Sequence, residues 1–146
     1  MVVDLNVFTN ESEKVFQVIE GLGFTFDRNM ALQRIKDEGM FEAWFKTLRL
    51  DVFTPSIPFS DEAAKTRVRV RFGNSEVFLL SDEALSVFKM LFNRPKDLVD
   101  LERLLLKQKG HLDVGWVERH LIEPVGVDDT RVTTWRRMVA STTELP

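Results

Sequence analysis

The chain has 146 residues and a formal net charge of −3, with 44% hydrophobic and 29% charged residues. This balance predicts a soluble globular protein with its own core, and the acidic net charge restricts any nucleic-acid contact to a local basic patch. The absence of cysteine excludes disulfides, thiol catalysis and zinc–cysteine sites. Together with the lack of a signal-peptide pattern or membrane-length apolar run, it favours a cytoplasmic location.

The first half of the chain predicts strands with helices between them. Residues 2–8 alternate and are rich in β-branched residues, which indicates a strand. A helix is predicted over residues 11–20, with an apolar face of Val15, Phe16 and Ile19. The remaining predicted elements are a helix over 29–36, strands over 24–26, 40–46 and 48–53, a helical turn over 60–65, and a hairpin of strands 67–72 and 76–80 around Gly73-Asn74-Ser75. The strands over 40–53 form either a tight hairpin or one bent strand.

Residues 81–106 predict two helices separated at Asn93-Arg94-Pro95, because proline cannot continue the first of them. The predicted apolar positions are Leu85, Phe88, Leu91 and Phe92 in the first helix and Leu98, Leu101, Leu104 and Leu105 in the second. Two further helices are predicted over 113–122 and 129–140, separated by Pro124-Val125-Gly126. The pattern predicts one domain of α+β (mixed α/β) class, sheet-rich over 1–80 and helical over 81–146.

Two aspartates, Asp4 and Asp51, interrupt strands whose neighbouring residues are aliphatic. Aspartate is depleted in strands, so each of them requires an explanation. Two acids on adjacent strands can hold Mg²⁺, a hard cation that prefers carboxylates, water and phosphates. The alternative is a solvated strand face or a salt bridge from Asp51 to Arg49.

Charged residues gather at the predicted junction between the two central helices. Lys89 lies about 40° from Leu85 on a helical wheel, so its stem can follow the core while its ammonium reaches a cleft. Asp97 opens the next helix and faces the same corner, and Asp100 shares its face. The alternative is a purely structural salt-bridge corner.

Arg67, Arg69 and Arg71 alternate with apolar residues along one predicted strand and therefore share one face. Such an arginine ladder can bind the phosphates of a nucleotide or of RNA. The alternative is the solvated outer face of an antiparallel sheet.

The run L-x-x-F-K-x-x-F-x-R-x-K-D-x-x-D-L, which ends at Leu101, resembles the helical motif of minimal nucleotidyltransferases of the polymerase-beta-like superfamily. The branch it most resembles contains the type IV abortive-infection toxins and related bacterial proteins. D-L-N-V-F from Asp4 is similar to the second catalytic motif of these enzymes, and L-D-V-F from Leu50 is similar to the strand that bears the third acid. The resemblance covers roughly residues 2–106.

The resemblance implies transfer of a nucleotide from a nucleoside triphosphate to an acceptor hydroxyl, and its toxin-like branch implies RNA or tRNA as the acceptor. Mg²⁺ would be held by Asp4 and Asp51. Lys89 would bind phosphates together with Arg67 and Arg94, and Asp97 would position Lys89 or a substrate group. An antitoxin protein is a further implied partner.

Two departures from the family pattern favour a chain that does not transfer nucleotides at a normal rate. The Asp-x-Asp motif is broken, because Val2 stands at the first acid if Asp4 is the second, or Asn6 at the second if Asp4 is the first. The Gly-Ser turn that cradles the triphosphate is absent. A truncated start, a degenerate relative, or completion by another chain would each explain this.

The alternative function is a non-catalytic interaction module that binds a nucleotide or a partner protein. Because the N-terminal elements of the family pattern are absent, the predicted strand over residues 2–8 has fewer neighbours in the sheet. It is then an exposed edge that could pair with a second copy in a homodimer.

Overall fold

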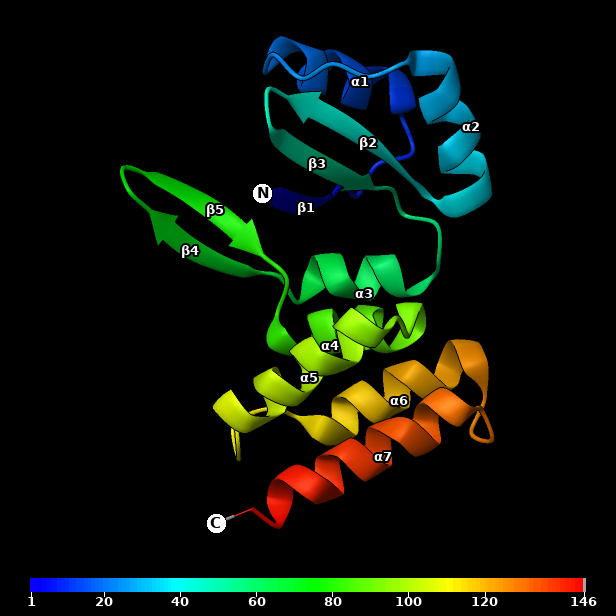
Figure 1. Cartoon of the computed structure of the whole chain (residues 1–146), viewed down its shortest axis with the longest axis vertical. Helices are drawn as coiled ribbons and strands as arrows, with labels where there is room; N and C mark the ends of the chain where they lie inside the picture. Colours follow the sequence, from blue (N-terminus) through cyan, green and yellow to red (C-terminus); the bar gives the residue numbers. More distant parts are fainter. Residues whose placement is uncertain (146) are drawn as a thin grey trace. The chain divides into compact units, whose positions relative to one another are not determined.

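The computed structural model describes residues 1–145, which form seven helices and five strands (Figure 1). The α+β prediction is confirmed, with a small mixed sheet early in the chain and helices towards its end. The chain divides into two compact units, with the boundary between Asp61 and Glu62. The second hairpin therefore belongs to the helical unit and not to the sheet-rich part in which the sequence grouped it. No helix within residues 1–145 is both long and apolar enough to cross a membrane.

The first unit contains three strands and two helices. Its elements are β1 (Val2–Asn6), α1 (Ser12–Gly21), α2 (Arg28–Glu38), β2 (Met40–Phe45) and β3 (Leu48–Phe53), and α3 (Phe59–Lys65) spans the boundary. β2 and β3 form the hairpin, not the bent strand, of the two predicted alternatives. The strand predicted over residues 24–26 is only a single bridge between Thr25 and Trp44. The sequence patterns therefore locate every larger element of this unit.

The sheet of the first unit has the order β1-β3-β2. β3 is the central strand, paired in parallel with β1 and antiparallel with β2. A parallel pair requires a long crossover, and here α1, α2 and β2 lie between the two strands in sequence. β1 pairs on one side only within the described residues, so it is an edge strand, as predicted.

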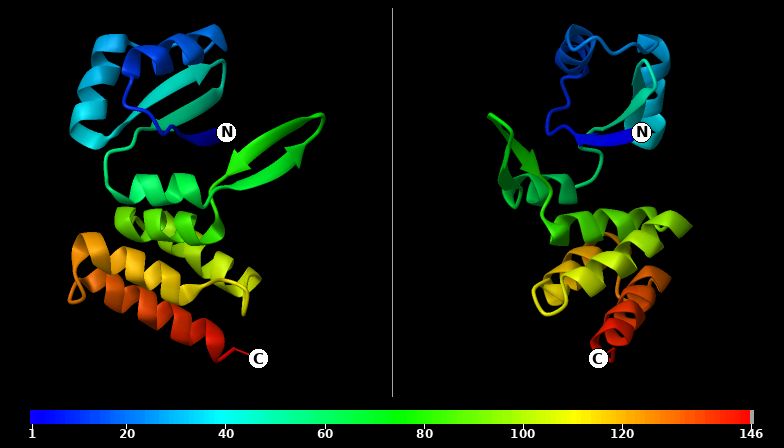
Figure 2. Two further views of the ribbon diagram at one scale, coloured as in Figure 1. Left: turned by 180° about the vertical axis from the view of Figure 1, so that it is seen from behind. Right: turned by 60° about the vertical axis from the view of Figure 1, so that its left-hand side comes forward.

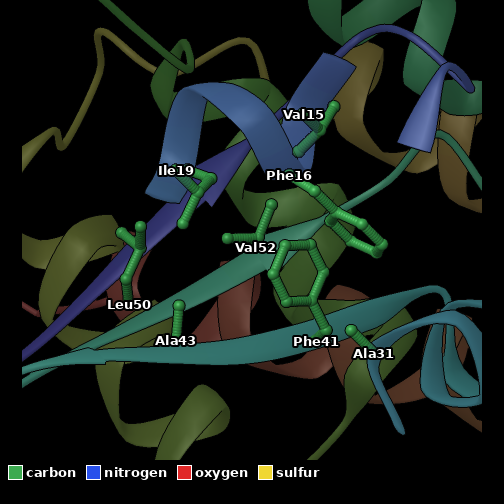
Figure 3. Packing of buried hydrophobic residues seen from close by; sticks show 8 residues of the cluster. All are labelled: Val15, Phe16, Ile19, Ala31, Phe41, Ala43, Leu50 and Val52. Carbon is green, nitrogen blue, oxygen red and sulfur yellow. The ribbon is translucent and has the colours of Figure 1, made fainter. Parts of the chain in front are cut away.

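Helices α1 and α2 cover one face of this sheet and bury the core of the unit (Figure 3). The predicted face of α1 is confirmed, because Val15, Phe16 and Ile19 are all buried. The cluster is completed by Ala31 from α2, Phe41 and Ala43 from β2, and Leu50 and Val52 from β3. Since alternate strand residues face opposite ways, the residues between these positions lie on the other face of the sheet.

The second unit consists of a β-hairpin and a group of four helices. Its elements are β4 (Val68–Phe72), β5 (Ser75–Leu79), α4 (Asp82–Phe92), α5 (Pro95–Lys107), α6 (Val114–Val125) and α7 (Thr130–Thr143). Both views of Figure 2 show the hairpin leading into the N-terminal end of α4, with its tip pointing away from the four helices. Helix α6 continues through Pro124 to Val125 and is capped by Gly126, where φ is 89°. Of the predicted separator Pro124-Val125-Gly126, only the glycine lies beyond the helix.

Helices α5, α6 and α7 pack around α4, which contacts all three. The buried positions of α4 are Ala84, Ser86, Val87 and Met90, and not the predicted stripe, of which Phe92 is exposed. The buried set therefore combines the small residues Ala84 and Ser86 with the larger Val87 and Met90. In α5 the deepest apolar positions, Leu101 and Leu105, are among those predicted.

Candidate functional site

Asp4 and Asp51 are neighbours on adjacent parallel strands. They are register partners in the β1–β3 ladder, so their side chains leave the same face of the sheet. Leu50 and Val52, on either side of Asp51, belong to the core beneath the helices. The two carboxylates therefore lie on the face away from α1 and α2, on backbones about 4.8 Å apart.

The two acids differ in their surroundings. Asp51 is buried, with 8% of its surface exposed, and pairs with Arg49 two residues earlier on the same face. Arg49 Nη2 donates a hydrogen bond of 3.0 Å to Asp51 Oδ2, while Arg49 Nε lies 2.8 Å from Oδ1 without the alignment of a hydrogen bond. Asp4 is exposed and has no hydrogen-bond or ion-pair partner among residues 1–145. The salt bridge between Arg49 and Asp51 that the sequence suggested is thus present, next to the exposed carboxylate of Asp4.

A third acid, Glu42, lies beside these two aspartates and was not identified from the sequence. We call Asp4, Asp51 and Glu42 the acid row. Glu42 on β2 is the register partner of Asp51, so it shares the face of Asp51 and Asp4. Its carboxylate lies 3.2 Å from Arg34 of α2. The alternation of Glu42 with the buried Phe41 and Ala43 indicates that the Glu42 side chain leaves the opposite face of the strand. Only the strand register shows that Glu42 lies next to Asp51.

The acid row offers a metal ion few ligands. Residues 1–145 contain no group of three or more His, Asp or Glu side chains placed to hold a metal ion. The row still offers the carboxylate oxygens that Mg²⁺ prefers, and Asp51 Oδ1 is a buried oxygen without a directed hydrogen bond. The Arg49 guanidinium already supplies positive charge there, so a cation at Asp4 and Asp51 would be held weakly.

A second charged site lies at the junction of α4 and α5, in the second unit. Lys89 Nζ is 2.9 Å from Asp100 Oδ2 and 3.7 Å from Asp97 Oδ1. Arg94 Nε donates to Asp97 Oδ2 over 2.7 Å, and Arg94 Nη2 donates to Oδ1 over 3.1 Å. These four residues, named here the junction cluster, balance two cations with two carboxylates. The sequence predicted that Lys89, Asp97 and Asp100 would share a corner, and they do.

Asp97 is the buried centre of the junction cluster, with 1% of its surface exposed. Its Oδ2 also accepts a hydrogen bond from the backbone N–H of Arg94, so the side chain helps to begin α5. Burial disfavours the charged carboxylate, but the hydrogen bonds from Arg94 outweigh it and hold the pKa of Asp97 below its usual value. Asp97 is therefore a charged structural anchor, whatever further role it has.

Of the two cations in the junction cluster, Lys89 has the more exposed partner. Its side chain is 20% exposed, and its closest partner, Asp100, has a side chain that is 45% exposed. A phosphate could take the place of the Asp100 carboxylate, since a half-exposed aspartate can turn towards water. Asp97 would stay fixed by Arg94 and keep the lysine in position.

Arg67 lies elsewhere in the second unit. It directly precedes β4, its guanidinium carbon is 4.6 Å from the centre of the Phe78 ring, and its Nη1 donates to the Ala64 carbonyl over 3.2 Å. The hairpin enters α4 at its N-terminal end, whereas Lys89 and Arg94 are at the other end of this eleven-residue helix. The helix alone separates these ends by about 15 Å. Of the predicted nucleotide-binding residues, only Lys89 and Arg94 belong to one cluster.

Comparisons of the chain with protein-family models and with curated proteins found no match.

Proposed function

We propose that this chain is a nucleotide-binding domain of the nucleotidyltransferase type, with Asp4 and Asp51 as its metal-facing acids. The observation that carries the proposal is the register of β1 with β3, which pairs these two aspartates on one face. Acids on neighbouring strands are a suitable arrangement for a cation that bridges the phosphates of a nucleoside triphosphate. The motif resemblance at Lys89 to Asp97 supplies the remaining support.

In this proposal each residue has a limited role. Asp4 and Asp51 would hold Mg²⁺, which would neutralise phosphate charge when bound. In the second unit, Lys89 would bind an anion and Asp97 would position Lys89, a role that rests on the motif resemblance alone. Arg49 opposes the metal by neutralising Asp51, so we propose binding of a nucleotide with slow transfer to an acceptor hydroxyl, RNA being the acceptor class that the resemblance suggests.

Isothermal titration with each Mg²⁺–nucleoside triphosphate tests the binding. Asp4→Asn should weaken binding and remove its dependence on Mg²⁺, because Asp4 is the exposed acid of the pair. Asp37→Asn is the matched control, since Asp37 is an exposed aspartate on α2 of the same unit. Equal affinity for wild type and Asp4→Asn, or absence of binding by the wild type, would overturn the metal-dependent proposal.

Label transfer from each triphosphate to total RNA, with Mg²⁺ or Mn²⁺, tests the reaction separately. We expect transfer that is slow and lost in Asp4→Asn. Transfer that Asp4→Asn leaves unchanged would show that the reaction belongs to other residues.

A non-catalytic module is the second candidate, and the pairing of the charged residues favours it. Asp51, Lys89 and Asp97 each already have an ion-pair partner. Such pairs stabilise a fold without a ligand. Nucleotide binding with no label transfer under any of the metal conditions would select this second candidate.

A further inference from the structure

One face of the β4–β5 hairpin concentrates positive charge in an acidic chain. This face carries three cationic side chains, Arg67, Arg69 and Arg71, and a single acidic one, Glu76, whereas the whole chain has a net charge of −3. The arginines are all exposed. Arg69 pairs with Glu76 at 3.5 Å, but both side chains are more than 60% exposed, and such a pair is weak.

The strand register places an aromatic ring among these cations. Arg69 is opposite Phe78, and Arg71 is opposite Glu76, so all four share one face of the hairpin. Arg67, two residues before Arg69, extends the row, with successive arginines about 6.8 Å apart along the strand. The face therefore presents a line of guanidinium groups beside one exposed ring. We call it the basic–aromatic face.

Phe78 is in contact with two of the arginines. The guanidinium carbons of Arg67 and Arg69 are 4.6 and 5.5 Å from the centre of its ring. Arg67 is further fixed by its hydrogen bond to the carbonyl of Ala64. An open hollow of about 380 Å³ adjoins this group and is lined by Ala64, Lys65, Arg67 and Phe78. Planar cations beside an exposed ring offer a surface on which another flat group can stack.

We propose that the basic–aromatic face binds single-stranded nucleic acid. The arginine row would follow the phosphates, and Phe78 with Arg67 would stack on an unpaired base. Single strands are favoured over duplexes, because bases within a duplex are not free to stack on a protein ring. Under the function proposed above, this strand would be the acceptor. That assignment depends on the proposed function, whereas the binding itself does not.

The opposite face of the hairpin differs in chemistry and provides an internal control. Val68, Val70, Phe72, Val77 and Leu79 make it apolar and exposed. A polyanion has no reason to bind there. Single substitutions on the two faces of the same hairpin therefore show which face binds.

Fluorescence anisotropy with a labelled oligouridylate of about twelve nucleotides measures binding directly, at several salt concentrations. The wild type should bind, with a logarithmic salt slope near −2 for about three phosphate contacts. The triple variant Arg67→Gln/Arg69→Gln/Arg71→Gln should lose about tenfold or more in affinity and most of the slope. The matched control is Arg103→Gln/Arg119→Gln/Arg137→Gln, which removes the same charge from exposed helix positions of the same unit and should retain affinity within about twofold.

Two further variants separate stacking and the choice of face from charge. Phe78→Leu should weaken binding about tenfold with the salt slope retained, since stacking on a ring contributes about this much per base. Phe72→Thr, on the apolar face, should have no effect. Circular dichroism and thermal melting identify variants that do not fold, and the two single substitutions keep the proposal testable if the triple variant fails.

Several results would overturn the proposal. These are no binding by the wild type, equal loss in the helix control, equal or tighter binding of a duplex of the same length, or loss in Phe72→Thr in place of Phe78→Leu. If oligonucleotide binding fails while nucleotide titration succeeds, this face is misassigned and the nucleotide site stands. The reverse result retains this face and removes the nucleotide site.

Discussion

The Asp97 carboxylate accepts three hydrogen bonds from Arg94 at the start of α5. Two come from the guanidinium and one from the backbone N–H of Arg94. Asn93, just before them, has a φ of 51° and ends α4 in the left-handed conformation. The start of α5 is thus held by one buried carboxylate, which also lies 3.7 Å from Lys89 of α4.

Asp97→Ala should destabilise the protein by about 2–3 kcal/mol, because it removes hydrogen bonds to a charged donor and a helix-starting contact together. The half-exposed Arg94 can be rehydrated, which keeps the cost below that of a fully buried unpaired charge. Urea unfolding measures the change. Asp100→Ala is the control and should cost less than about 1 kcal/mol, and equal losses would contradict a central role for Asp97.

Acid should destabilise the protein in part through Asp97 and Asp129. Hydrogen bonds from the Arg131 side chain lower the pKa of Asp129 to about 2, and the pKa of Asp97 is also lowered. A lowered folded-state pKa gives stability that is complete above the unfolded value, near about 3.9, and that disappears as the pH falls through the folded value.

Unfolding of wild type, Asp97→Asn and Asp129→Asn between neutral pH and about pH 2 measures this dependence. Each variant should be less stable at neutral pH and should lose less stability on acidification. A variant whose stability falls in parallel with that of wild type would show that its aspartate is not lowered in pKa.

Removal of Arg49 should strengthen metal binding at the acid row. Arg49→Met leaves the Asp51 carboxylate without its cation, so a divalent ion becomes the remaining source of positive charge next to Asp4. The variant should melt at a lower temperature than wild type, and millimolar Mg²⁺ should raise its melting temperature more than that of wild type.

The double variant Arg49→Met/Asp4→Asn is the control, because it lacks one of the two acids. It should lose most of the Mg²⁺ effect. An Mg²⁺ response that persists in the double variant would place the ion away from Asp4.

Lys89→Met should separate nucleotide binding from stability. Methionine retains most of the apolar stem, and the lost pair with Asp100 is partly exposed, so the cost should be about 1 kcal/mol or less. Nucleotide affinity should fall in titration calorimetry, whereas Lys107→Met, at an exposed position of α5, should bind as wild type does. Unfolding of Lys89→Met would instead assign Lys89 a structural role.

The sequence predicts the local features of this fold well, because each is encoded by neighbouring residues. Alternating patterns locate both hairpins, and the Asn93–Pro95 break separates α4 from α5 as expected. The junction cluster also follows from helical spacing on either side of that break. In such cases the interacting residues are at most a few turns apart along the chain.

What the sequence could not supply is the long-range pairing. Asp4 and Asp51 become neighbours only because β1 pairs with β3 and not with β2, and the same register brings in Glu42. Hydrophobic periodicity also misplaced the buried side of α4, because a helix with neighbours on several sides buries small residues as well as large ones. Both features depend on tertiary contacts that no local pattern specifies.

The placement of tryptophan gives each unit its own optical reporter. Trp44, on β2 of the first unit, is 45% exposed, whereas Trp135, on α7 of the second, is completely buried. Indole emission shifts to the red in water, so loss of the helical core should appear as a red shift from Trp135, with little change from Trp44. Single-tryptophan variants with phenylalanine at the other positions would record the melting of the sheet and of the helices as two separate curves.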